Sequence, residues 1–299
     1  MTGYLHPNYA ESFSEFGKPH PLPRCGGHLL VRQVPNTDCV DAMGCYPLFC
    51  CQDWTRLRED LEALGHQMVS VALVADPFGN HDEPLLRGCF DRVVKFKEHF
   101  IADLSRPLEQ VISKHHRYYA RQALKKVQVE VAAAPLDFLE EWVGLYRQLI
   151  ERHGIGGFRA FSRDSFARQL AVPGMTLVRA TLNGTSVAMH LYYGHGDVHY
   201  SHLAACSPEG YAVNAMYAVY LRSLEHFIGK ARWLNWGGSA GVTHDGTDGL
   251  AQFKRGWSIA VRQVYFCGLT LDPARYETLT RERGGPATDY FPAYRRGEF

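Results

Sequence analysis

Two patterns of hydrophobic and polar positions alternate along the first hundred residues. Residues 53–64 carry leucines at helical spacing, and residue 65 is a glycine that can close the helix. Residues 68–74 (MVSVALV) form a continuous apolar run, which is typical of a strand covered on both faces. Further strands are predicted at 28–34, at 46–51 and at two places between 93 and 104, with a helix at 83–89. This part of the chain therefore predicts an α/β arrangement.

The remaining chain predicts a fixed order of elements. The expected elements are a helix pair within 105–126, a strand at 127–132, helices at 136–150 and 163–171, strands at 176–182, 186–193 and 198–206, a long helix at 211–229, a short strand at 232–236, a short helix ending near 257 and a strand at 261–271. Asn183-Gly184 predicts a tight hairpin turn. The charged tail after about Arg281 is expected to be a surface extension, and no internal repeat is visible by residue identity.

A glycine-rich connection lies near the end of this order, within residues 233–257 (WLNWGGSAGVTHDGTDGLAQFKRGW). A strand breaks at Gly237-Gly238, and after a loop of small residues a helix carries Lys254 and Arg255 near its end. Glycines let backbone N–H groups approach an anionic or carbonyl ligand closely. The alternative is an ordinary strand-to-helix connection. No G-K-[ST] follows the glycines, which excludes a nucleotide-hydrolysing P-loop.

Composition and charge are those of a soluble globular protein. The net charge is +1, so any anion binding must come from a local patch. No apolar run reaches the ~18 residues that span a bilayer, and the N-terminus lacks a signal pattern. We therefore expect a cytoplasmic protein without membrane insertion. The eight cysteines include no C-x-x-C pair, so we interpret them as reduced thiols and expect no metal site.

One predicted helix carries a concentration of positive charge. Lys114, Arg117, Arg121 and Lys125 recur at spacings of three or four and would share one face. Such a stripe suits contacts with phosphate groups. A solvated helix surface is the alternative, because many exposed helices carry such charges.

Several short motifs together resemble the FemAB-like acyltransferases of the GNAT superfamily. The segment SKHHRYYARQALKKVQVEV (113–131) resembles their basic helix and following strand, and Asn183-Gly184 with Ala188 resembles their dG-x-x-va pattern. Ser207-Pro208 stands where they often carry S-P, and Trp236-Gly237-Gly238 followed by 253–257 (FKRGW) is similar to their G-G-G and F-K-x-x-F/W ending. The match covers about residues 106–262.

The resemblance implies an α+β fold with two GNAT-like (acyl-CoA N-acyltransferase) domains. Each would be a twisted, mixed and mostly antiparallel sheet flanked by helices, with an N-terminal domain at 1–105 and a C-terminal FemAB-like domain at 106–299.

The implied activity is acyl or aminoacyl transfer that forms an amide on a small-molecule or peptide amine. Acyl-CoA or aminoacyl-tRNA would be the co-substrate, with no permanently bound cofactor, and tRNA would be a partner in the second case. The chain departs from the acetyl-CoA pattern after the third strand of the meander, where 207–212 (SPEGYA) replaces a Q/R-x-x-G-x-G/A pyrophosphate loop. The alternative function is a non-catalytic GNAT-fold protein that binds a nucleotide-linked or peptide ligand.

Lys254 is the first candidate for a catalytic role, facing a developing oxyanion or a donor phosphate. Tyr200 and His202 are expected to share one face of a strand, and a histidine is the natural base near neutral pH. Three strand histidines, His190, His199 and His202, lack zinc-ligand spacing and are more often hydrogen-bonded structural residues.

Asp245 and its neighbour Asp248 are candidates for orienting the amine, with turn and capping roles as the alternative. The remaining candidates would bind the donor or substrate: Arg117, Arg121, Lys125, Gly237, Gly238 and Arg255.

Overall fold

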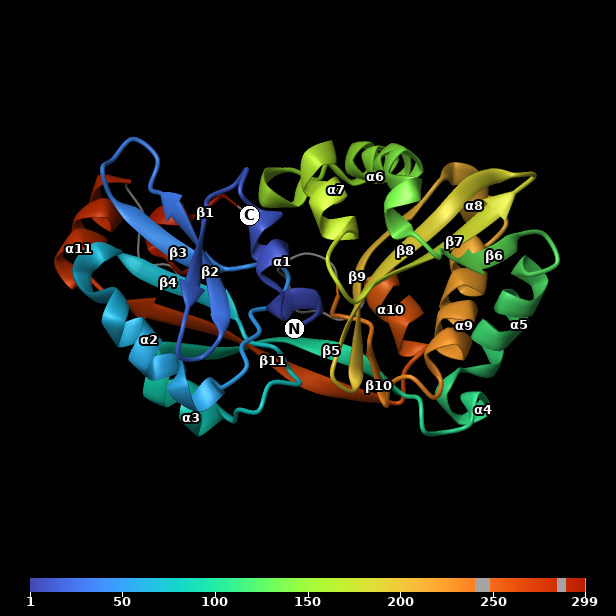
Figure 1. The fold of residues 1–299 in the computed structure, drawn as a ribbon, viewed down its shortest axis with the longest axis horizontal. Helices are drawn as coiled ribbons and strands as arrows, with labels where there is room; N and C mark the ends of the chain where they lie inside the picture. Colours follow the sequence, from blue (N-terminus) through green and yellow to red (C-terminus); the bar gives the residue numbers. More distant parts are fainter. Residues whose placement is uncertain (240–247, 284–288, 299) are drawn as a thin grey trace. The chain divides into compact units, whose positions relative to one another are not determined.

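The computed structural model describes residues 1–239, 248–283 and 289–298, and it divides the chain into two compact units (Figure 1). Unit 1 contains Met1–Gly3 and Lys97–Gln263, and unit 2 contains Tyr4–Phe96 and Val264–Phe299. This division differs from the domain boundary expected after residue 105, because the last part of the chain belongs with the first part. Two of the three boundaries between the units, after residues 96 and 263, fall inside strands.

Unit 2 has a five-strand order flanked by helices. Its elements are α1 (Pro7–Glu11), β1 (Lys18–Leu22), β2 (Gly27–Gln33), β3 (Val40–Gly44), α2 (Leu57–Leu64), β4 (Ser70–Val74), α3 (Glu83–Cys89), the beginning of β5 (Arg92–Asp103), the end of β11 (Ala260–Thr270) and α11 (Pro273–Glu282). The strand order is β1-β2-β3-β4-β11, with β3 and β4 parallel and the other described pairs antiparallel.

Apolar residues of α2 and α3 form the core of unit 2 against one face of its sheet. Leu57 and Leu61 of α2 and Leu86 of α3 are fully buried in one cluster with Val71 and Leu73 of β4. The expected α/β arrangement is therefore confirmed. The strand predicted at 46–51 is wrong: apart from one bridge between Phe49 and Ala75 the segment is irregular, because burial of an apolar run does not by itself require strand pairing.

The C-terminal tail is not the surface extension that its charge suggested. Tyr294 and Arg295 are buried in unit 2, where Arg295 Nη2 donates to Asp41 Oδ1 at 2.8 Å. The Tyr294 hydroxyl donates to Asp41 Oδ2 at 3.0 Å and lies 2.8 Å from Ser70 Oγ. Hydrogen bonds and an opposite charge offset the burial of the guanidinium, so these residues anchor the tail to β3 and β4.

Unit 1 contains the larger sheet. Its elements are α4 (Leu108–Val111), α5 (Lys114–Ala123), β6 (Gln128–Val131), α6 (Leu139–His153), α7 (Arg163–Leu170), β7 (Met175–Leu182), β8 (Thr185–His195), β9 (Val198–Cys206), α8 (Pro208–Ala212), α9 (Ala215–Phe227), β10 (Trp233–Asn235) and α10 (Gly249–Arg255), together with the end of β5 and the beginning of β11. The order is β6-β7-β8-β9-β10-β5-β11, and β9 and β10 are parallel.

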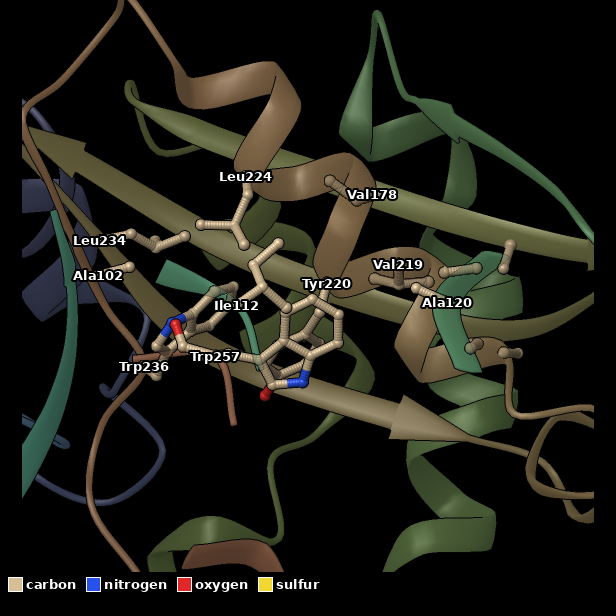
Figure 2. Packing of buried hydrophobic residues seen from close by; sticks show 14 of the residues in the cluster. Ala102, Ile112, Ala120, Val178, Val219, Tyr220, Leu224, Leu234, Trp236 and Trp257 are labelled. Atoms are coloured by element: carbon tan, nitrogen blue, oxygen red, sulfur yellow. The ribbon is translucent and has the colours of Figure 1, made fainter. Parts of the chain in front are cut away.

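Helices cover both faces of the unit 1 sheet. Helices α6 and α7 lie on one face, and α5 and α9 lie on the other (Figure 1). On the α9 side, Trp236 stacks on Tyr220 with ring centroids 4.3 Å apart, and its indole N–H donates to the carbonyl of Trp257 at 2.9 Å (Figure 2). These aromatic residues anchor both ends of the glycine-rich connection in the core.

The two halves of the chain repeat one order of elements. Each has a three-stranded meander, a helix, a strand parallel to the last meander strand, a helix and a final strand: β1-β2-β3-α2-β4-α3-β5 in the first and β7-β8-β9-α9-β10-α10-β11 in the second. The final strands are exchanged. Residues 101–103 of β5 pair with β10 in unit 1, and residues 266–270 of β11 pair with β4 in unit 2. Each unit is thus a mixed, mostly antiparallel sheet flanked by helices, as expected.

Candidate functional site

The site is built on the turn that follows β10. Strands β9 and β10 pair in parallel only through residues 198–200 and 233–235. After Asn235 the chain stays with β5: Trp236 N donates to Phe100 O at 2.9 Å, and Phe100 N donates to Gly237 O at 3.1 Å. Gly237 has a φ of +75°, a left-handed conformation that favours glycine, and its N–H donates to Asn235 Oδ1 at 2.9 Å. The two parallel strands therefore part at this turn.

Lys254 of α10 reaches this turn from a buried position. The side chain is only 9% exposed, and its Nζ donates to Gly238 O at 2.8 Å. Burial lowers the pKa of Lys254 to about 7; repulsion by Lys97 adds to the shift, and attraction by Asp248 opposes it. Near neutral pH the ammonium and the free amine are therefore both populated. A desolvated ammonium of this kind interacts more strongly with a new negative charge than one in water.

Two residues that the sequence analysis did not single out complete the surroundings of the turn. Lys97 of β5 donates from Nζ to Ser239 O at 3.1 Å, and burial is the largest cause that lowers its pKa. His99, also on β5, is buried and hydrogen-bonds to the Asn235 side chain, and burial lowers its pKa to about 3. In a strand over 92–97 (RVVKFK) Lys95 and Lys97 share one face, as on many solvent-facing strands, so the sequence carried only a weak signal.

Asp248 caps the N-terminus of α10, which is the capping role that the sequence offered for it. Asp248 Oδ1 accepts the N–H of Ala251 at 2.8 Å. Asp245 lies outside the described residues, so its proposed role in orienting the amine stays a prediction. Arg255 is exposed, and its guanidinium lies 5.7 Å from the centre of the Phe100 ring. It extends to a different side of α10 from the buried Lys254.

Tyr200 and His202 share the buried face of β9, as expected. His202 Nε2 lies 3.0 Å from Gln169 Oε1 of α7, and burial lowers its pKa to about 3. A ring that stays neutral at such a low pH does not favour His202 as a proton acceptor near neutral pH. Tyr200 is the register partner of Asn235, so it lies on the strand position next to the glycine turn.

The other two strand histidines have structural partners on the α9 side. His190 lies 2.7 Å from both Ser201 Oγ and the Tyr192 hydroxyl, and His199 stacks on Phe227 with centroids 4.0 Å apart. No group of three or more histidine, cysteine or acidic side chains suited to a metal ion occurs in the part of the chain that the structure describes. The described residues likewise contain no helix that is long and apolar enough to cross a bilayer.

The basic stripe lies on α5, with one difference from the prediction. Arg117 is half-buried and Arg121 is exposed, whereas Lys125 follows the end of the helix and donates to Gln122 Oε1 at 3.2 Å. The described residues 111–129 contain no acidic side chain, and Tyr118 between the arginines is 59% exposed. The stripe is therefore a locally cationic surface with an exposed aromatic ring.

His116 joins this basic helix to the helix of Lys254. Its Nε2 lies 3.0 Å from the carbonyl oxygen of Phe253, which can only accept, so this nitrogen carries the proton. Its Nδ1 lies 2.9 Å from Ser113 Oγ, and Ser113 N donates to Gly256 O at 2.9 Å. A β-carbon at Gly256 would overlap the His116 ring. The glycine that ends the Phe-Lys-Arg-Gly sequence therefore leaves space for the His116 imidazole, whose hydrogen bond holds α10 in place.

Residues 208–212, where the sequence has no pyrophosphate-loop pattern, form the short helix α8. Ser207 caps α8 by accepting the N–H of Gly210 at 3.1 Å, and Asn214, with a φ of +60°, separates α8 from α9. The sequence predicted one helix from 211 to 229. The left-handed residue explains why the structure has two.

The chain matches a known sequence family over about half its length. Residues 110–255 match the family described as an acetyltransferase (GNAT) domain. No curated protein matched the chain.

Three solved structures share the fold of almost the whole chain. FemX has a TM-score of 0.65 at 14% identity, over 91% of this chain and 92% of that one. The C-terminal DUF2156 domain of an Agrobacterium fabrum protein assigned as a lysylphosphatidylglycerol synthetase has a TM-score of 0.64 at 13% identity, over 91% and 90%. L-PGS from Bacillus licheniformis has a TM-score of 0.57 at 14% identity, over 93% and 96%. Residues 110–255 of the chain thus resemble a GNAT acetyltransferase domain in sequence, and almost the whole chain has the fold of FemX.

Proposed function

We propose that this protein transfers an acyl or aminoacyl group to an amine and so forms an amide. The observation that carries the proposal is the buried Lys254 ammonium at the glycine turn, next to the point where β9 and β10 part. A preorganised cation in a water-poor site is the kind of group that stabilises the oxyanion of acyl transfer. The GNAT fold and the likeness to FemX support acyl transfer in general.

The proposed reaction needs no bound cofactor. The neutral amine of the acceptor attacks the carbonyl carbon of the donor, the carbon–nitrogen bond forms, and the carbonyl oxygen becomes negative. Lys254 as an ammonium stabilises that charge. As the oxyanion collapses, the bond to the leaving oxygen or sulfur breaks, and the proton released by the amine ends on the leaving group or in solvent.

Two features support aminoacyl-tRNA over acyl-CoA as the donor. Helix α8 occupies the sequence position of the pyrophosphate loop. Ser207 caps this helix, and Gly210 is packed too closely to accept a β-carbon, so the segment is a helix in place of that loop. The cationic α5 surface with its exposed Tyr118 suits a nucleic-acid backbone and a stacked base. The acceptor is proposed to be a small-molecule or peptide amine.

A donor panel tests this function. The melting temperature is measured with aminoacyl-tRNA minihelices, the matching uncharged minihelices, CoA thioesters and UDP-linked sugars, followed by transfer to simple amines. A ligand that binds the native state raises the melting temperature with its concentration. We expect the aminoacyl minihelix to stabilise the protein and to yield amide. Stabilisation by CoA thioesters with amide formation would assign the other donor. Binding of a UDP-linked sugar with no transfer from any donor would favour the non-catalytic alternative.

The basic surface of α5 gives a second prediction. Replacing Arg117 and Arg121 by Glu should weaken minihelix binding and reduce the slope of log affinity against log salt, by about one for each phosphate that the protein no longer neutralises. Titrations at several salt concentrations measure both quantities. Arg58→Glu with Arg87→Glu is the control, because it makes the same change in net charge at two exposed arginines of other helices. Equal decreases in affinity in the two double variants would show that only net charge matters and that α5 is a solvated surface.

A further inference from the structure

Ser201 lies at the point where the parallel strands β9 and β10 part. The last paired residues are Tyr200 and Asn235, and beyond them β9 pairs only with β8 among the described strands. The pairing of β8 with β9 also shifts register directly after Ser201, at His202. Bulges of this kind are frequent next to active sites, because they redirect side chains. Ser201 is half-buried, so this position is partly accessible where the strand has an unpaired edge.

A chain of hydrogen-bonding side chains runs from Ser201 into the core of unit 1. Ser201 Oγ lies 2.7 Å from His190 Nε2, and the other ring nitrogen, Nδ1, lies 2.7 Å from the Tyr192 hydroxyl. The Tyr192 hydroxyl lies 2.8 Å from Ser223 Oγ, which lies 2.8 Å from the carbonyl oxygen of Val219. His190, Tyr192 and Ser223 are fully buried, so Ser201 is the accessible end of this chain.

The buried end fixes the direction of every hydrogen bond in the chain. A carbonyl oxygen only accepts, so the Ser223 hydroxyl donates to Val219 and accepts from Tyr192. The Tyr192 hydroxyl has then used its proton, so it accepts from His190 Nδ1–H. Burial holds the pKa of His190 well below its ordinary value, so the ring is neutral and Nε2 carries no proton. The Ser201 hydroxyl therefore donates to His190, and its oxygen can only accept from a ligand.

Strand β10 leads to the second polar group at this point. After its last paired residue, Asn235, the chain continues to Gly238, whose carbonyl accepts from Lys254 Nζ at 2.8 Å. The charge of Lys254 also contributes to the low pKa of His190, after burial, so the ammonium lies close enough to act on the chain of side chains. An obligate acceptor, Ser201, and a cation thus occur together where the two strands part.

We propose that Ser201 is a catalytic residue that accepts a hydrogen bond from the N–H of the attacking amine, and that His190 and Tyr192 are positioning residues that keep its hydroxyl turned inward. This inference rests on the proposed function, whose acceptor it would orient. As the carbon–nitrogen bond forms, the nitrogen becomes positive while it keeps its protons, so its N–H is a stronger donor in the transition state than in the free amine. Ser201 stabilises this positive end and Lys254 the negative oxygen.

No proton moves along the chain of side chains in this step; it leaves the nitrogen afterwards, to the leaving group or to solvent. A serine that attacked the donor itself would have to pass its proton to the histidine, and the imidazolium would need a stabilising partner such as a carboxylate. Here that partner is Tyr192, whose pKa burial raises well above its ordinary value, so it stays uncharged. The charge of Lys254 would also repel an imidazolium on His190. These contacts favour hydrogen-bond acceptance by Ser201 over a covalent acyl-enzyme.

Nitrogen-15 NMR of the full chain tests the direction of the hydrogen bonds without any substrate. Near neutral pH, with the ring of His190 identified by sequential assignment, we expect the neutral tautomer that carries its proton on Nδ1. The tautomer protonated on Nε2 would make Ser201 a donor toward His190's neighbour position lost, and would overturn the inference. Tyr192→Phe removes the oxygen that accepts from Nδ1–H, so the preference for this tautomer should weaken in that variant.

Steady-state kinetics of amide formation, at saturating donor and varied amine, test the role of the hydroxyl. Ser201→Ala should lower kcat on the order of tenfold to a hundredfold, the loss expected for a hydrogen bond to a charged group, with little change in the KM of the donor. Ser201→Thr keeps the hydroxyl and should retain most of the rate. Ser186→Ala is the matched control, since it removes the hydroxyl of a half-buried serine near the beginning of β8 and should leave the rate unchanged.

A normal rate for Ser201→Ala would overturn the role of Ser201, and so would equal losses in Ser201→Ala and Ser201→Thr with unchanged melting temperatures. Wild-type protein mixed with donor alone should show no increase in intact mass. A gain of one acyl group that Ser201→Ala abolishes would make Ser201 a covalent nucleophile and contradict the proposal. If the wild type transfers no acyl group from any donor, the proposed function fails and this role fails with it, whereas a normal rate for Ser201→Ala refutes the role alone.

Discussion

Replacing Lys254 by Met is expected to lower the transfer rate about a hundredfold, the typical loss when one oxyanion-stabilising donor is removed. Met keeps the length and the apolar stem of the side chain. Because Lys254 is buried, the melting temperature should stay unchanged or rise, since a partly charged amine is replaced by an apolar group. Transfer rate and melting temperature are measured side by side, with Lys95→Met as a control that should change neither. A normal rate would remove Lys254 from the mechanism, and a collapsed melting temperature would assign it to structure.

The pH dependence sharpens this test. The folded pKa of Lys254 lies near 7, below its ordinary value of 10.5. The unfolded chain therefore binds the proton more tightly, so burial of Lys254 destabilises the protein below pH 7, and this effect is relieved as pH rises from about 7 to 10.5. If the ammonium is the active form, kcat/KM should decrease as pH rises above about 7, with the slope of a single titrating group. Lys254→Met should lack that loss. A rate that rises through the same range in wild type and is flat in the variant would indicate a general base instead.

Gly256→Ala is expected to destabilise unit 1 by about 3 kcal/mol, the upper range for overpacking a filled core. The added β-carbon would overlap the His116 ring, which is enclosed by Tyr217, Phe253 and Trp257. The ring can move away only by breaking its hydrogen bond to the Phe253 carbonyl. Denaturant unfolding measures the change in the free energy of unfolding.

A double variant separates this overlap from other effects of alanine. His116→Ala alone should also destabilise, because it leaves a cavity and an unsatisfied Phe253 carbonyl. In the double variant the total destabilisation should be clearly less than the sum of the two single effects, since the β-carbon then meets no ring. Strict additivity would contradict the proposed overlap. Gly249→Ala is a control, because a β-carbon there would meet no atom within 4 Å.

Local chemistry made much of the secondary structure predictable. The β7–β8 hairpin was predicted from Asn183-Gly184, and both residues have the positive φ, +50° and +82°, that such a turn requires. Strand β9 was predicted at 198–206 and helix α3 at 83–89, and both are confirmed because their patterns are bounded by turn or capping residues. Where a residue broke such a pattern without an evident signal, as Asn214 does, the prediction merged two helices.

Long-range contacts explain what the sequence could not predict. Lys254 was chosen for its motif, but its burial depends on the turn at Gly238 and on Lys97, more than 150 residues away in the chain. The domain boundary after residue 105 assumed that neighbours in sequence fold together. Pairing of β11 with β4 and of β5 with β10 is set by strand contacts that no local pattern records.

The exchange of final strands also determines the order in which the two units can be completed during translation. Residues 4–96 are translated before most of unit 1. On the side away from β3, however, β4 has no partner until β11, which ends at Thr270, has been made. At about 5–20 residues per second, that strand edge waits for roughly 9 to 35 seconds. Unit 1, by contrast, has all its residues once Gln263 has been added. The unit whose residues are mostly translated first is thus completed last, and until then β4 keeps an unpaired edge that can pair with a wrong strand.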